Sequence, residues 1–147
     1  MNLPTLSQLV PILQLAVGPV ILISGVGLLQ LSLTNRLGRL IDRARLLSRE
    51  RTAAGTGNTT RIDAQLAIID RRAGILQRSI TLGALTVLLV SVLILVLFVS
   101  ALLQLESGLL VIALFCAALC TLIGSTLFFL QEMKLSLEAV RLEIRRE

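Results

Sequence analysis

The sequence predicts an all-α integral membrane protein with three transmembrane helices, which extend into a cytosolic helical hairpin and a cytosolic C-terminal helix. Of its 147 residues, 55% are hydrophobic and only 16% are charged, whereas soluble domains carry about 25% charged residues. The charged residues are also confined to blocks that long uncharged runs separate. A single membrane domain over residues 1–147 accounts for both observations.

Three runs contain no Asp, Glu, Lys or Arg: residues 1–35, 79–105 and 107–131. Each run is longer than the roughly 20 apolar residues that cross a hydrocarbon core about 30 Å thick. The predicted transmembrane helices are approximately 8–34, 79–103 and 109–130.

Residues 35–78 predict a helical hairpin, because apolar side chains recur at spacings of three and four on both sides of a small, Gly-containing turn at 53–60. The same spacing in residues 131–147 predicts a C-terminal helix. Folding the hairpin at its turn brings Asp42 level with Arg71 and Arg43 level with Asp70. These four side chains are therefore expected either to form two crossed ion pairs or to remain solvated.

The distribution of basic residues predicts the orientation. Of fourteen Lys and Arg, ten lie between the first two spans and four in the C-terminal segment. Positive charges favour the cytosolic side, so we expect a multi-pass protein of the inner (plasma) membrane with its N-terminus outside and its C-terminus in the cytosol. The Arg residues beside the membrane are expected to contact anionic lipid head groups.

The first span carries a stripe of small and polar residues. At about 100° per residue, Gln14, Gly18, Gly25 and Ser32 fall on one face of the helix. Small residues allow helices to approach closely in lipid. Two interpretations stay open: the stripe packs against the other spans, or it faces a subunit interface or a water-filled pore.

The third span has small residues at spacings that predict a second packing face. They are Ala113, Cys116, Ala117, Cys120 and Gly124. Its partner is either another span of the same chain or a second subunit. Because a chain of this size has little room to bury both faces internally, we expect a homo-oligomer.

Several functions are disfavoured by what the chain lacks. There is no His, which is the commonest general base and metal ligand. The spans contain no ionisable acid or base of the kind that coupled transporters use. All four Phe lie in the second and third spans, which leaves no aromatic side chain to stack on nucleic acid bases. We therefore expect no enzyme activity, no metal or cofactor, and no nucleic acid partner.

The run NRLGRLIDRAR at residues 35–45, which follows a Pro- and Gly-bearing first span, resembles a family of small prokaryotic three-span membrane proteins catalogued as domain-of-unknown-function family 2721. The residues that carry this motif are Asn35, Arg36, Arg39, Asp42, Arg43 and Arg45. The resemblance implies a membrane protein and assigns no catalytic residue.

Three hypotheses on function follow. The first is a non-enzymatic, self-associating membrane protein with an Arg-rich cytosolic hairpin. The second is a homo-oligomeric pore or channel for ions or small solutes that the first span lines. The third is a subunit of a larger membrane hetero-complex.

Overall fold

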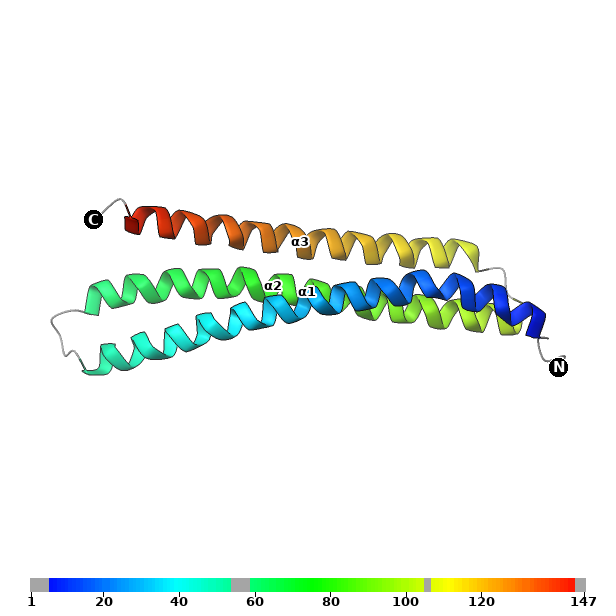
Figure 1. Cartoon of the computed structure of the whole chain (residues 1–147), viewed down its shortest axis with the longest axis horizontal. Coiled ribbons are helices and arrows are strands. Elements are labelled where there is room, and N and C mark those ends of the chain that lie inside the picture. The colour runs from blue at the N-terminus through cyan, green and yellow to red at the C-terminus, as the bar shows by residue number, and fades with distance from the viewer. Residues whose placement is uncertain (1–5, 54–58, 105–106, 145–147) are drawn as a thin grey trace. The chain divides into compact units, whose positions relative to one another are not determined.

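A computed structural model describes residues 6–53, 59–104 and 107–144, and in this part of the chain it consists of three long α-helices (Figure 1). The helices are α1 (Leu6–Ala53), α2 (Thr59–Leu103) and α3 (Gly108–Ile144). Each is long and apolar enough to cross a membrane. The predicted all-α class with three such helices is confirmed.

Each helix is longer than a membrane span requires. The helices contain 48, 45 and 37 residues, which at 1.5 Å per residue gives lengths of roughly 72, 68 and 56 Å. The hydrocarbon core is only about 30 Å thick. In α1, one continuous helix includes Pro11, Pro19 and the charged residues that follow the first uncharged run.

Short connections join α1 to α2 and α2 to α3. Between α1 and α2, the middle of the predicted turn at 53–60 lies outside the described residues. At the end of α2, Gln104 has a φ of 52°, the left-handed conformation that commonly closes a helix. The backbone N–H of Val111 then donates to the carbonyl of Ser107 at 3.1 Å and begins α3.

The chain divides into two compact units. The first comprises Met1–Gln30 and Leu82–Ile123, and its buried side chains are small or of medium size. They are Ala16, Val26, Thr86, Val90, Leu93 and Ala118.

The second unit comprises Leu31–Thr81 and Gly124–Glu147. Its hairpin has an apolar seam in which Leu47, Ile62 and Ile69 are buried. Leu40, Ala44 and Leu66 pack against this cluster. The apolar spacing in the sequence predicts this seam.

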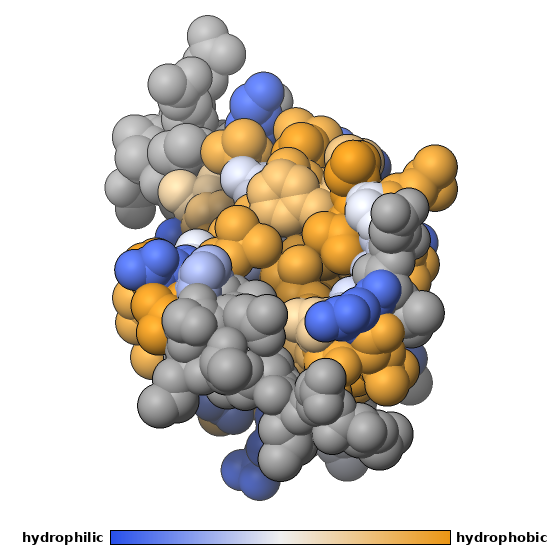
Figure 2. All heavy atoms as spheres, turned by 90° about the vertical axis from the view of Figure 1, so that its right-hand side faces the viewer, coloured by the Kyte–Doolittle hydropathy of each residue, from blue (hydrophilic) through white to orange (hydrophobic). Residues whose placement is uncertain are grey.

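The surface of the helices is apolar where the sequence is uncharged. Leu15, Leu28 and Leu109 are exposed, whereas Ser79 and Ser125 are fully buried. In the end-on view of Figure 2, apolar side chains make up most of the described surface nearest the viewer. Such an arrangement is suited to lipid, because hydrocarbon solvates leucine and cannot hydrogen-bond a hydroxyl.

Candidate functional site

An acidic side chain between two Arg residues is the most developed polar site in the described structure. The Glu132 side chain of α3 forms ion pairs with Arg36 of α1 and Arg72 of α2. The Arg36 Nη1 atom donates to Oε2 at 3.2 Å, and the Arg72 Nη2 atom donates to Oε1 at 2.7 Å. One carboxylate therefore contacts both other helices of the second unit.

The contribution of this cluster to the stability of the fold depends on the burial of its carboxylate. Only 2% of the Glu132 side chain is exposed, against 31% for Arg36 and 20% for Arg72. A buried charge is tolerated when it is paired and hydrogen-bonded, and here each carboxylate oxygen accepts a charge-assisted bond. Removing the carboxylate would leave two guanidinium groups without their counter-charge.

Two further groups of α3 position Arg36. Its guanidinium carbon lies 5.3 Å from the centroid of the Phe129 ring, within the range of a cation–π interaction. Its Nη1 atom also contacts the sulfur of Met133 at 2.8 Å. On the other side, the Nε atom of Arg72 is buried and has no hydrogen-bond partner among the described residues. Among the described residues, the Glu132 carboxylate accepts the hydrogen bond of the Arg72 guanidinium.

Hydroxyl groups join α2 and α3 elsewhere. In the second unit, the Ser79 hydroxyl donates to the carbonyl of Ser125 at 2.7 Å, and the Ser125 hydroxyl donates back to the carbonyl of Ser79 at 2.8 Å. In the first unit, the hydroxyls of Thr86 and Thr121 lie 2.9 Å apart. Interhelical hydrogen bonds of this kind contribute about 0.6–2 kcal/mol each within a membrane.

The stripe on α1 is exposed. The side chains of Gln14 and Ser32 and the two glycines, Gly18 and Gly25, all lie on the surface of the described chain. A Cβ atom built on either glycine would meet no heavy atom within 4 Å. Among the described residues, neither glycine has a close neighbour from another helix.

The small residues of the third span are mostly exposed as well. Gly124 is half-buried, and the remainder of the predicted face is on the surface: Ala113, Cys116, Ala117 and Cys120. Both thiols are free. The side of α3 that packs internally instead contains Ala118, Thr121 and Ser125.

The predicted crossed ion pairs are not formed among the described residues. Asp42 lies 3.9 Å from Arg45 on its own helix, and the ion pair that joins the hairpin arms is Arg51 with Asp63, at 3.0 Å. The physical reason is the position of the apolar seam. At about 100° per residue, Asp42 and Arg71 both point away from the seam.

Arg43 and Asp70 flank the seam on opposite sides, so they also cannot meet. In the motif, Asn35 and Arg39 are likewise exposed, whereas Arg36 is half-buried because it reaches Glu132. Sequence reasoning missed the role of Glu132. The available signal was its position as the first charge after the third uncharged run, one turn beyond Phe129.

The three helices are apolar, bury serine and threonine hydroxyls and the Glu132 carboxylate, and expose leucine side chains. These features are those of a multi-pass membrane protein. The family model described as "Protein of unknown function (DUF2721)" matches residues 16–142, and the chain belongs to this family. The match confirms the resemblance that rests on residues 35–45. No curated protein and no solved structure matches the chain.

Proposed function

We propose that this protein is a non-enzymatic membrane component that self-associates through the α1 stripe and holds its Arg-rich hairpin at the cytosolic face of the inner membrane. The observation that carries the proposal is the open surface at Gly18 and Gly25, where an added Cβ would meet nothing within 4 Å.

The chemistry of the stripe favours protein over lipid as its neighbour. Glycine in a helix costs about 1 kcal/mol relative to alanine, and this cost is offset in membranes when the missing side chain lets a second helix approach. Gln14 adds an exposed amide on the same face. An amide gains a hydrogen-bond partner from another helix but none from hydrocarbon. A second copy of α1 offers both the close approach and the partner.

The hairpin supplies a second part of the function. Arg39, Arg43, Arg49, Arg71 and Arg78 are exposed in the described structure, and none of them takes part in the pairing with Glu132. Each basic residue near an anionic leaflet contributes about 1 kcal/mol of attraction. Contact with anionic head groups would hold the hairpin close to the membrane surface.

The test is the mass of the protein in lipid nanodiscs by native mass spectrometry. We expect wild type to form a defined oligomer and Gly25→Leu to lower the mass of that oligomer, because the leucine side chain separates the helices at the stripe contact. Gly27→Leu is the matched control, since Gly27 is equally open but points to the opposite side of α1. A monomeric wild type, or equal behaviour of the two variants, would contradict the proposal.

The pore hypothesis makes a different prediction in the same experiment. Polar residues on the exposed stripe, Gln14 and Ser32, favour it as the second candidate. A pore requires a closed ring of at least four subunits, in which Gly25→Leu abolishes ion flux into vesicles while the ring persists. A subunit of a hetero-complex would form no defined oligomer alone.

A further inference from the structure

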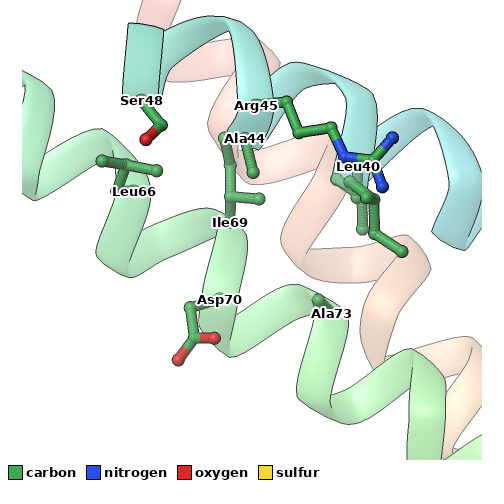
Figure 3. A pocket seen from close by; sticks show the side chains of 9 residues that line it. Leu40, Ala44, Arg45, Ser48, Leu66, Ile69, Asp70 and Ala73 are labelled. Carbon is green, nitrogen blue, oxygen red and sulfur yellow. The ribbon is translucent and has the colours of Figure 1, made fainter. Parts of the chain in front are cut away.

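An open groove runs along the hairpin between the charged arms of α1 and α2 (Figure 3). It has a volume of about 390 Å³ and belongs entirely to the second unit. Its floor is apolar, and Arg45, Ser48 and Asp70 complete its lining. The apolar lining includes Leu40, Ile41, Ala44, Leu66, Ile69 and Ala73.

The two charged residues lie on opposite sides of the groove. Arg45 belongs to α1 and Asp70 to α2, and Figure 3 shows their side chains pointing away from each other. The Arg45 side chain is 72% exposed and lies at the long distance of 3.9 Å from Asp42. Asp70 is exposed and forms no ion pair within the described residues. Neither charge is neutralised by the other within one chain.

Both charges also lie at nearly the same height along the hairpin. Ala44 packs against the cluster that contains Ile69, and Figure 3 shows these two side chains next to each other, which indicates the register of the arms. In this register Arg45 and Asp70 are about two residues apart along the axis, or roughly 3 Å. The groove thus presents a positive and a negative side at one level.

We propose that a second copy of this chain occupies the groove, in a parallel dimer with two-fold symmetry. Two copies inserted in the same membrane share their orientation, so the two-fold axis is parallel to the membrane normal. Rotation about this axis places α1 of one copy opposite α2 of the other at the same height. Arg45 of each copy then meets Asp70 of the other.

Symmetry makes this surface self-complementary, with two equivalent ion pairs enclosing two apolar floors. Burial of residues such as Ile41, which is 41% exposed in the single chain, supplies affinity. The charge pairs select the partner and its orientation. This contact is separate from the α1 stripe and does not depend on it.

Charge reversal provides the test, in nanodiscs and in the Gly25→Leu background, so that the stripe does not contribute. Arg45→Asp creates an all-negative groove and Asp70→Arg an all-positive one. We expect each variant alone to dimerise about tenfold more weakly, from two lost attractions and the new repulsions. An equimolar mixture of the two, distinguished by mass, is expected to form the heterodimer with near wild-type affinity, as is the double variant with itself.

The control is Arg43→Asp, which makes the same charge change on an exposed residue outside the groove. Recovery in the mixture also shows that the single variants fold. A chain without dimers in this background would overturn the proposal. The same holds for a mixture no stronger than its components, which is the result expected if lipid or another protein fills the groove.

Failure of the stripe and failure of the groove are distinguishable. If the stripe is not an interface, Gly25→Leu leaves the mass of the wild-type assembly unchanged, and recovery in the mixture still reports on the groove.

Discussion

Glu132 shows how a single residue can hold three helices in register. Its carboxylate is 2% exposed and binds guanidinium groups from α1 and α2. Arg36 reaches it from just beyond the first uncharged run, and Arg72 from the residues that precede the second. All three residues therefore belong to the charged segments beside the uncharged runs, and the two guanidinium groups balance the charge of the carboxylate.

We expect Glu132→Gln to lower the free energy of unfolding by about 2–3 kcal/mol, measured by denaturant titration in detergent micelles. Breaking a buried ion pair costs about 3–5 kcal/mol, and the smaller value reflects the partial solvation of both Arg side chains. Glu50→Gln is the matched control, because Glu50 is exposed on α1. Its effect should stay within about 0.5 kcal/mol. Equal losses in the two variants would show that the cluster does not stabilise the fold.

At the scale of elements, the hairpin depends on the face that each residue presents. Leu46 and Leu47 are neighbours in the sequence, yet Leu47 is buried in the seam and Leu46 is 59% exposed. The helical period separates them by about 100°. The same geometry explains why residues at the right height, such as Asp42 and Arg71, do not pair.

Leu47→Ala should therefore destabilise the hairpin by about 2 kcal/mol, because it opens a cavity beside Ile62 and Ile69. Leu46→Ala removes the same atoms from an exposed position and should cost about 0.5 kcal/mol or less. Hydrogen exchange of the backbone amides in the arms measures both effects. Equal exchange in the two variants would mean that the seam does not hold the arms together.

At the scale of the whole molecule, the basic residues predict how the chain lies in its membrane. In a background of Cys116→Ala and Cys120→Ala, we expect Asn2→Cys to react with an impermeant maleimide on intact cells. Glu147→Cys should react only after lysis, because the Arg-rich segments stay on the cytosolic side. Lysed cells, in which both sites react, provide the control. Labelling of Glu147→Cys on intact cells would reverse the proposed orientation.

The uncharged runs and the apolar spacing determine the number, length and class of the helices, since both depend on local composition and on the helical period. The seam of the hairpin follows from the same spacing. The relation of Arg36, Arg72 and Glu132 does not, because each residue is unexceptional in its own segment and the site exists only when three helices meet.

Tertiary structure also decides which faces are covered. By sequence alone, two faces resemble surfaces that pack inside a protein: the α1 stripe at Gly18 and Gly25, and the α3 face at Cys116 and Cys120. The faces that are buried in the structure are instead those that contain Val26, Ala118 and Ser125. In lipid, a helix gains little from hiding apolar side chains, so hydrogen bonds and close fit between helices choose the inner face. These depend on the neighbouring helices and cannot be read from one helix alone.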